Sequence, residues 1–468
     1  MTNATNKTQQ QSWVLPVTLA IAFFMENMDA NIIATSLPQI ANATHTTPVA
    51  LKLAMTSYLI SLCVLTPISG WIVDNFSARA TFRYSIIIFM IGSLLCAASQ
   101  TLCFFVIARF LQGIGGAMMV PVARLVILRA TQKEDLVSAL SWFSIPALVG
   151  PLIGPPIGGF ITTYFSWHWI FLINIPIGIL ALICAALYMP KKEELFKTSL
   201  DIKGFILSAT AVMAFIFGTS IISQPNLPKE YGLTLTVIGI VSAMAYYKYA
   251  QTAKSPLFSV KLFNNNVFRK CIIGGSLFRI GIGAIPFLLP LMFQLCFKMS
   301  AMESGCLVFI AAAGSIFMKT AVNFFFNRFS IYYMLVIGTV ISAAFIAIYG
   351  LFTQYTPYWL ILTILFFSGF LRSMFFSAIN ALGFSEISKE EMSQATPLHA
   401  VATQISIALG IAIAGIVLET CSTIHGGDNT LSDFSYAFYI VAFLSMCSVF
   451  VFASFDKNVG SSLQSKNK

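Results

Sequence analysis

Long apolar runs recur along the whole chain, and this pattern constrains its fold more than any other feature. A helix needs about 20 apolar residues to cross the hydrocarbon core of a bilayer. Fourteen segments reach that length, at residues 13–41, 49–73, 81–100, 102–130, 136–164, 167–189, 202–224, 231–251, 268–297, 302–325, 331–352, 357–385, 393–420 and 433–455. Because backbone polar groups must be hydrogen-bonded within lipid, each run is expected to be helical. The sequence therefore predicts an all-α polytopic membrane protein with fourteen transmembrane helices.

The basic residues predict how these helices are oriented. Lys and Arg concentrate in alternate connecting segments and at both ends of the chain, whereas the other connecting segments hold only Lys52, Lys229 and Lys298. Cytoplasmic loops carry the excess of positive charge, so both termini are expected in the cytoplasm, which requires an even number of helices. This distribution also accounts for the net charge of +10. The charge therefore gives no reason to expect a nucleic-acid partner, and the lipid bilayer itself is the expected surroundings.

Polar connecting stretches divide the helices into groups of six, two and six. We expect an N-terminal six-helix bundle at residues 1–190, linkers and two extra helices at 191–267, and a C-terminal six-helix bundle with a short tail at 268–468. Two six-helix halves with a binding site between them are a recurring plan among transporters. The two extra helices contain no buried charge and are expected to lie outside that site.

The first apolar run contains two acids, Glu26 and Asp29. Their spacing of three residues places them on one helix face. A carboxylate near the bilayer centre costs about 2.5–3.5 kcal/mol on insertion scales, so such a residue normally faces protein or a water-filled cavity. One interpretation is a polar patch buried between helices, and the other is a proton-carrying site in a transporter. Arg109 in the fourth run lies at a similar depth, so we expect it to pair with Asp29.

The fifth run is unusually rich in glycine and proline. Its segment VGPLIGPPIGGF, residues 149–160, repeats glycine every four residues at Gly150, Gly154 and Gly158. A stripe of small residues lets helix backbones pack closely in membranes. Prolines such as Pro155 remove backbone donors and bend a helix. We therefore expect this helix to be both a packing surface and a hinge.

Four motifs follow one another along the chain: MDANIIATSLP at 28–38, GWIVDNFSARATFR at 70–83, ARFLQGIGGAMMVPVARL at 108–125, and the glycine- and proline-rich segment of the fifth run. In this order they resemble the fourteen-span drug:proton antiporter family of the major facilitator superfamily, and its multidrug exporters in particular. The resemblance extends over about residues 13–455. It implies the major facilitator fold and proton-coupled export of small organic compounds.

The resemblance also implies roles for individual residues. It assigns proton coupling to Asp29 and Arg109, and we add Glu26 as a second acid. It assigns the inward/outward switch to the loop after the second span and to the fifth-span stripe, that is, to Gly70, Asp74, Arg79, Gly150, Gly154, Pro155, Gly158 and Gly159. Within the loop, glycine would allow a close helix approach. The short Asp side chain would suit the N-terminus of a neighbouring helix, where the helix dipole favours negative charge.

Cations inside the apolar runs are the other unusual polar feature. They are Arg124, Arg279, Lys319 and Arg372, in addition to Arg109. The remaining acids inside the runs are few and lie near outer ends, so these cations are expected to pair either with backbone carbonyls or with an anionic ligand. We expect the substrate site to contain Arg124, Arg279, Arg372 and Asn380. Abundant Phe and Met would line a cavity that adapts to varied apolar ligands.

These patterns, with the family resemblance, predict a proton-coupled secondary exporter of small organic compounds, of the multidrug type, that acts as a monomer in the bacterial cytoplasmic (inner) membrane. A dedicated exporter of one anionic metabolite, such as a carboxylate siderophore, is the alternative that the buried cations favour. A membrane scaffold on the same fold would need neither the acids nor the glycine stripe. The sequence contains no phosphate-binding loop, nucleophile set or metal-ligand spacing. We therefore expect no enzymatic activity, cofactor or metal.

Overall fold

The computed structural model describes residues 13–131, 135–190, 199–222, 228–253, 256–388 and 391–461. Its α-helices are α2 (Val14–Ile32), α3 (Leu37–Ala43), α4 (Lys52–Leu65), α5 (Ser69–Asn75), α6 (Ala78–Ala97), α7 (Leu102–Ala130), α8 (Leu136–Tyr164), α9 (Trp169–Leu172), α10 (Asn174–Tyr188), α11 (Ile202–Ile221), α12 (Lys229–Thr252), α13 (Asn266–Leu295), α14 (Ala301–Arg328), α15 (Ile331–Tyr349), α16 (Tyr358–Ser385), α17 (Met392–His425) and α18 (Leu431–Ala453). Three short 3₁₀ helices join them: η1 (Ile33–Thr35), η2 (Thr66–Ile68) and η3 (Val260–Asn264).

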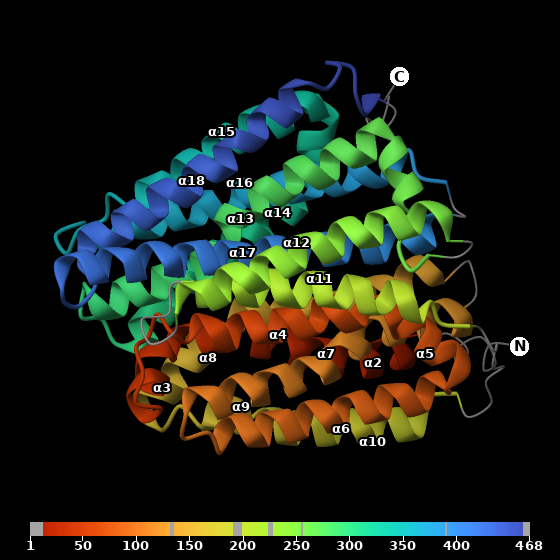
Figure 1. Ribbon diagram of the computed structural model, residues 1–468, viewed down its shortest axis with the longest axis horizontal. Helices are drawn as coiled ribbons and strands as arrows, with labels where there is room; N and C mark the ends of the chain where they lie inside the picture. Colours follow the sequence, from red (N-terminus) through yellow and green to blue (C-terminus); the bar gives the residue numbers. More distant parts are fainter. Residues whose placement is uncertain are drawn as a thin grey trace, which may run out of the picture.

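The prediction of fourteen transmembrane helices is confirmed. Within the described ranges, 14 helical stretches are long and apolar enough to cross a membrane. Because this number is even, α2 begins and α18 ends at the same end of the molecule, on the right in Figure 1. We call this the termini end, and we call the opposite end, where α3 lies, the far end.

The first apolar run is not one continuous α-helix, although its length alone suggests one. The α-helix α2 ends at Ile32, a 3₁₀ turn follows, and α3 starts at Leu37. Pro38 lies in the first turn of α3, a position that proline favours because its missing N–H would have no partner there. The break leaves backbone carbonyls near Thr35 available to groups from other helices.

The helices form two bundles. The N-bundle consists of α2 to α10 and lies in the lower half of Figure 1. The C-bundle consists of α13 to α18 and lies in the upper half. The bundles meet along two seams, one between α4 and α17 and the other between α8 and α14. The division of the chain after residues 190 and 267 stays a prediction. The N-bundle precedes the predicted middle segment, and the C-bundle follows it.

The largest apolar core that the two bundles share lies near the far end, as far as the described residues show. There, residues of the first span such as Ile33 and Leu37 pack in one cluster with Phe287 of α13 and Leu418 of α17. Toward the termini end the cores are separate, one within the N-bundle and one within the C-bundle. The structure is therefore closed at the far end, whereas toward the termini end each bundle has a core of its own.

Hydrogen bonds also join the bundles near the far end. Gln294 of α13 donates to the backbone carbonyl of Thr35 at 3.0 Å, using a carbonyl made available by the break in the first span. The backbone N–H of Met302 in α14 donates to the hydroxyl of Thr163 in α8 at 3.1 Å. These contacts tie one bundle to the other on both sides of the shared core.

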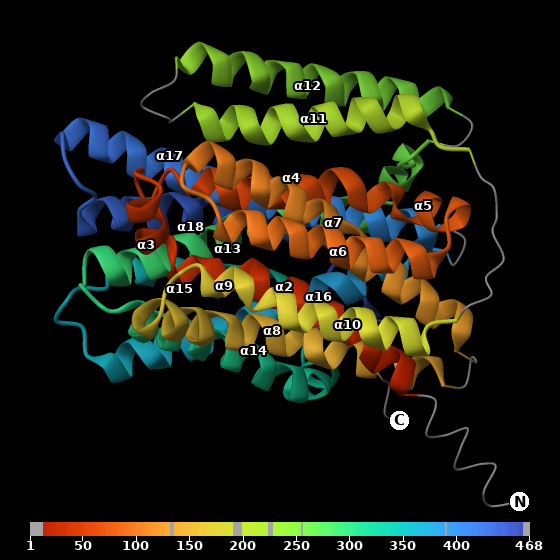
Figure 2. The same ribbon diagram turned by 90° about the horizontal axis from the view of Figure 1, so that it is seen from below.

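The two extra helices lie at the periphery. They pack mainly against each other, and α11 also covers the seam between α4 and α17. Its Ile216 is buried among Ile60 and Val64 of α4 and Ala408 of α17. Figure 2 shows α12 outside α11, on the edge of the molecule. This placement agrees with the lack of buried charge in their sequences.

The glycine stripe of α8 packs against α2, inside the N-bundle. A Cβ atom on Gly150 would lie 3.0 Å from the backbone nitrogen of Met28, and one on Gly158 would lie 2.6 Å from the carbonyl oxygen of Ile32. Gly159 points the other way, because a Cβ there would lie 2.3 Å from the carbonyl oxygen of Ala301 in α14. The stripe therefore serves packing within one bundle, whereas Gly159 serves the seam between bundles.

Candidate functional site

Asp29 lies at the centre of a fully buried polar network. Its Oδ2 atom is 2.6 Å from Nη1 of Arg109, which makes the pair an ion pair with side chains only 0% and 1% exposed. Its Oδ1 atom accepts hydrogen bonds from the side-chain amides of Gln112, at 2.8 Å, and Asn174, at 2.7 Å. Three donors from two further helices thus surround one carboxylate, an arrangement that fits its ionised form.

The donors around Asp29 are themselves held in place. Ser93 of α6 accepts from Gln112 at 2.8 Å and from Asn174 at 3.1 Å. The guanidinium of Arg109 also donates to Oε1 of Gln112 at 2.6 Å. Helices α2, α6, α7 and α10 therefore meet at this network. A change in the charge of the carboxylate would alter hydrogen bonds to side chains of all four helices.

The expected partnership of Asp29 with Arg109 is present, but three members of the network are new. Gln112 has one signal in the sequence, its position three residues after Arg109 on the same helix face. Asn174 and Ser93 have none, because isolated Asn and Ser residues are common near helix ends and in membrane helices. Only the packing of α6 and α10 around α2 and α7 places them at the carboxylate.

Glu26 occupies a different environment from Asp29. It accepts from the hydroxyl of Tyr58 at 3.2 Å and from the side-chain amide of Asn27 at 3.0 Å. Within the described residues it has no cationic partner. The ring of Tyr58 also lies against the guanidinium of Arg109, 4.4 Å from its centroid. Tyr58 therefore contacts both Glu26 and the guanidinium that pairs with Asp29, while Glu26 itself stays outside the ion pair.

The substitution Glu26→Gln is expected to leave transport partly active. Glutamine keeps the volume and an oxygen that accepts from Tyr58, so packing and this hydrogen bond are preserved. The bond becomes one between neutral groups, which contributes about 0.5–1.5 kcal/mol where a bond to a charged group contributes about 1.5–3 kcal/mol. The initial rate of pH-gradient-driven transport in proteoliposomes measures the effect. A variant with no activity at all, although correctly inserted, would show that Glu26 is as essential as Asp29.

The loop after the second span contains a second ion pair. Asp74 accepts from Arg129, at the end of α7, at 2.8 Å, and both side chains are partly exposed. Arg79 donates to the backbone carbonyl of Ala186 in α10. The motif suggests a helix N-terminus as the partner of Asp74, whereas the contact that the structure gives it is a guanidinium. Both contacts stay within the N-bundle at its termini end.

Gly70 does not lie at a close helix approach, contrary to the expectation from the motif. A Cβ atom at this position would meet no atom of the described residues within 4 Å. The residue is exposed at the start of α5, where the second span resumes after a 3₁₀ turn. The role of Gly70 in the conformational switch stays a prediction, and in this conformation the residue has no packing role.

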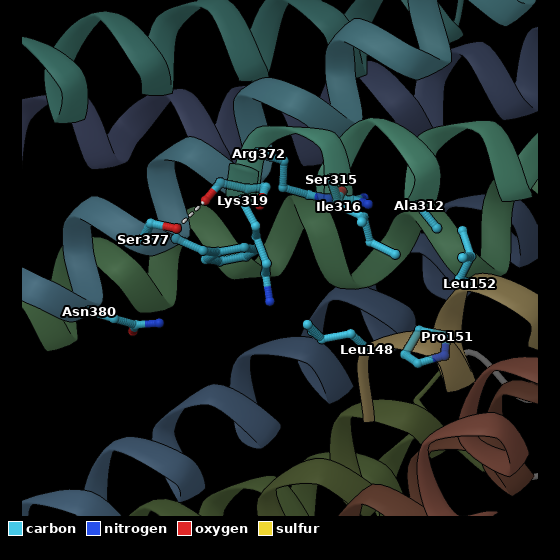
Figure 3. Close-up of a pocket in the computed structure, with 12 residues that line it drawn as sticks. Leu148, Pro151, Leu152, Ala312, Ser315, Ile316, Lys319, Arg372, Ser377 and Asn380 are labelled. Atoms are coloured by element: carbon cyan, nitrogen blue, oxygen red, sulfur yellow. Dashed lines mark hydrogen bonds between the residues drawn. The ribbon is translucent and has the colours of Figure 1, made fainter. Parts of the chain in front are cut away.

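A cavity of about 300 Å³ lies between the bundles, next to the seam of α8 and α14. Figure 3 shows α8 residues such as Leu148 and Pro151 on one side and residues of α14 and α16 on the other. Its lining residues are Leu148, Pro151, Leu152, Ala312, Ser315, Ile316, Lys319, Arg372, Ser373, Phe376, Ser377 and Asn380. Such concave, mostly apolar sites with a few polar groups are typical of small-molecule binding.

The structure brings together only some of the expected substrate-site residues. Arg372 and Asn380 line the cavity, together with Lys319. Arg279 does not: it is 4% exposed, its guanidinium lies 3.2 Å from Nε2 of His399 and 3.5 Å from Oδ1 of Asn380, and it stacks near Phe376. Arg279 therefore forms a layer behind the cavity wall.

Arg124 is not among the residues that line this cavity. It is an exposed residue of α7 in the N-bundle, whereas the cations of the cavity belong to the C-bundle. The sequence predicts its depth along the helix but not its direction around it. The two helices that carry the cavity cations are α14 and α16. Of the four predicted substrate-site residues, Arg372 and Asn380 thus share one surface, and Arg124 and Arg279 do not reach it.

The model of the Major Facilitator Superfamily matches residues 19–411, which is most of the chain. The chain belongs to the major facilitator superfamily. Solved structures of other transporters agree with this fold. The nucleoside transporter NupG, solved as a point mutant, superposes with a TM-score of 0.66 over 94% of this chain and 99% of its own, at 15% identity. A D-xylose-proton symporter gives 0.67 over 94% and 97%, at 13% identity.

Relatives with higher identity are bacterial. The protein named "Putative multidrug resistance protein MdtD" of Pectobacterium atrosepticum is 33% identical over 436 residues, covering 92% of each chain. Its namesake in Escherichia coli O157:H7 is 32% identical over 457 residues, covering 97% of this chain and 96% of its own. The chain is thus a major facilitator superfamily transporter and a multi-pass protein of the bacterial inner membrane.

Proposed function

We propose that this protein is a proton-coupled exporter that exchanges external protons for small organic compounds, with Asp29 as the principal proton site. The observation that carries the proposal is the buried network in which one carboxylate accepts from Arg109, Gln112 and Asn174. A buried acid with a single cationic partner can exist in two states, charged and paired or neutral and released. Protonation would remove the charge that holds four helices around it.

The position of Asp29 suggests how protonation would reach the interface between bundles. Asp29 lies one turn before the end of α2, and the break that follows supplies the Thr35 carbonyl bound by Gln294 of the C-bundle. A shift of α2 on protonation would therefore act on a contact between the bundles. We propose that this weakens closure at the far end and permits the alternate, outward-open arrangement.

The direction of transport follows from orientation. We propose that the termini end is cytoplasmic, as the distribution of Lys and Arg predicts. In this orientation the closed far end faces outward, and we propose that the cavity takes up an internal compound from the cytoplasmic side. The membrane potential supplies about 2.3 kcal/mol per proton per 100 mV, and the pH gradient adds to it. We propose that a monomer carries out the cycle, with no cofactor.

A second candidate function is the export of one anionic metabolite rather than of many drugs. The observation that favours it is the cavity wall with Lys319 and Arg372. Both candidates use the same proton site and differ only in the range of compounds accepted.

The proposal is tested in everted membrane vesicles energised by respiration, in which an acridine dye reports the pH gradient. We expect at least one compound of a panel of organic anions and cations to dissipate the gradient in vesicles that contain the protein, and not in vesicles without it. Accumulation of that compound should stop when nigericin collapses the pH gradient and valinomycin the potential. Accumulation that persists without either gradient would exclude proton coupling.

A further inference from the structure

The cavity between the bundles has an uneven charge. Lys319 of α14 and Arg372 of α16 both line it, and no acidic side chain is among its lining residues within the described part of the chain. In Figure 3, Lys319 extends from α14 toward the side on which Leu148 lies. Two cations thus share one small cavity without an acid to neutralise them.

The surroundings of these cations are also without acids among the described residues. Within the described part of the chain, neither Lys319 nor Arg372 forms an ion pair with an acidic side chain. Arg279, in the layer behind, contacts His399, Asn380 and the ring of Phe376, none of which is an acid. A third cation therefore adds to the positive field in the cavity. Cations in a membrane interior are costly unless they face a partner or water, and a cavity walled by one sign of charge concentrates ions of the other.

The hydroxyl groups of Ser315 and Ser377 are not free to donate to a ligand. The single hydroxyl proton of Ser315 has two backbone acceptors within reach, the carbonyls of Ala311 at 3.0 Å and Gly369 at 2.9 Å. Ser377 donates to the carbonyl of Ser373 at 2.9 Å. The strongest donors that remain for a ligand are the ammonium, the guanidinium and the amide of Asn380, so the polar part of the cavity suits an acceptor group.

The wall opposite the two cations indicates which kind of nonpolar group a ligand would carry. Leu148, Pro151 and Leu152 of α8 are apolar, and Ile316 and Phe376 continue this surface across the seam. An apolar or aromatic body would bury against them. The apolar wall of α8 belongs to the N-bundle, whereas both cations belong to the C-bundle. A ligand that satisfies both walls must therefore touch both bundles at once.

We propose that the cavity binds an amphipathic organic anion, with its carboxylate or sulfonate on Lys319 and Arg372 and its apolar body against α8. This inference rests on the proposed function and names the substrate class of that transporter. It replaces the sequence-based expectation that Arg279 contacts the ligand directly. Arg279 is a positioning residue instead, since it acts through Asn380 and Phe376.

The test uses the purified full-length protein in lipid nanodiscs at equal pH throughout, so that binding is measured without proton coupling. The probes are 1-naphthoate and 1-naphthylmethylammonium, which share a ring system and differ in charge. Equilibrium dialysis should show saturable binding of the anion and weaker binding of the cation. Lys319→Gln and Arg372→Gln should each weaken naphthoate binding about tenfold, corresponding to one lost charge-assisted contact of about 1.4 kcal/mol. Lys248→Gln, which removes an exposed cation of peripheral α12, should have no effect.

Charge-preserving variants separate recognition from folding. Lys319→Arg and Arg372→Lys should retain most of the naphthoate binding, whereas a structural role in packing would be disturbed by either exchange. Absence of saturable naphthoate binding to the parent protein overturns the inference. So does equal weakening of both probes in the Gln variants, which would mean that these cations only bind backbone carbonyls.

A parallel measurement distinguishes this inference from the proposed function. Asp29→Asn should keep naphthoate binding but lose transport driven by a pH gradient. If the parent protein binds naphthoate yet no compound of the panel moves with protons, the coupling proposal fails and the anion site stands. If a cationic compound moves with protons and naphthoate does not bind, the anion site fails and the coupling proposal stands.

Discussion

Asp29→Asn is expected to abolish transport driven by a pH gradient, to the level of liposomes without protein. Asparagine has the shape of a protonated aspartate but cannot release a proton, so the site is fixed in one of its two states. The variant should still insert and fold, because the proposed cycle itself requires a neutral side chain at this position. Removing Arg109 is different: it leaves a buried carboxylate without its cation, which costs about 3–5 kcal/mol.

The measurement compares two modes of transport in proteoliposomes. A pH gradient should drive accumulation by the parent protein but not by Asp29→Asn, whereas exchange of labelled for unlabelled compound at equal pH should continue in both. Asp135→Asn serves as the control, since it removes an exposed acid of the same bundle for which the structure gives no side-chain hydrogen bond at the start of α8. Gradient-driven accumulation by Asp29→Asn at the parental rate would disprove the assignment.

Gly159→Leu is expected to hold the bundles apart at the far end and to reduce transport by about tenfold or more. A single Cβ atom here would already lie 2.3 Å from the carbonyl oxygen of Ala301 and 2.7 Å from Cα of Met302, both backbone atoms of the other bundle. Overpacking of this kind costs about 1–3 kcal/mol, and about 1.4 kcal/mol corresponds to a factor of ten in population. The closed far end would therefore become the minor state.

Spin labels on opposite bundles at the far end report this shift directly. Phe165, after α8, and Tyr355, between α15 and α16, are both exposed and suit labelling after the exposed cysteines Cys103 and Cys306 are replaced. The label-to-label distance should lengthen in Gly159→Leu. Gly338→Ala is the control, because a Cβ there makes only an ordinary contact, 3.6 Å from Met374, within the C-bundle. Unchanged distances together with parental transport would show that this seam does not restrict the cycle.

The sequence predicts well where a residue lies along a helix. Apolar length locates the spans, and depth counted from their ends correctly pairs Asp29 with Arg109. The family motifs add the fold and the tight packing of the α8 glycines. These predictions succeed because the thickness of the bilayer gives every helix a common scale, and because a costly charge at a given depth demands a partner at the same depth.

The direction in which a side chain points around its helix is much harder to predict. The sequence predicts that both Arg279 and Arg372 lie near mid-membrane, yet only Arg372 lines the cavity. In a soluble protein, the contrast of apolar and polar faces would identify the buried side. In a membrane helix both the lipid-facing and the protein-facing sides are apolar, so this contrast is lost. The network partners Ser93 and Asn174 escape prediction for the same reason.

The position of α11 has a consequence for how a compound dissolved in the bilayer reaches the cavity. Two bundles that separate at one end open two lateral portals to the lipid, one along each seam. Here α11, with Ile216 buried against α4 and α17, occupies the portal on one flank, and α12 lies outside it. Among the described helices, the flank of α8 and α14, where the cavity lies, has no such cover. We therefore expect a compound dissolved in the bilayer to enter along the flank of α8 and α14, where it would meet the apolar wall of α8 before the cations.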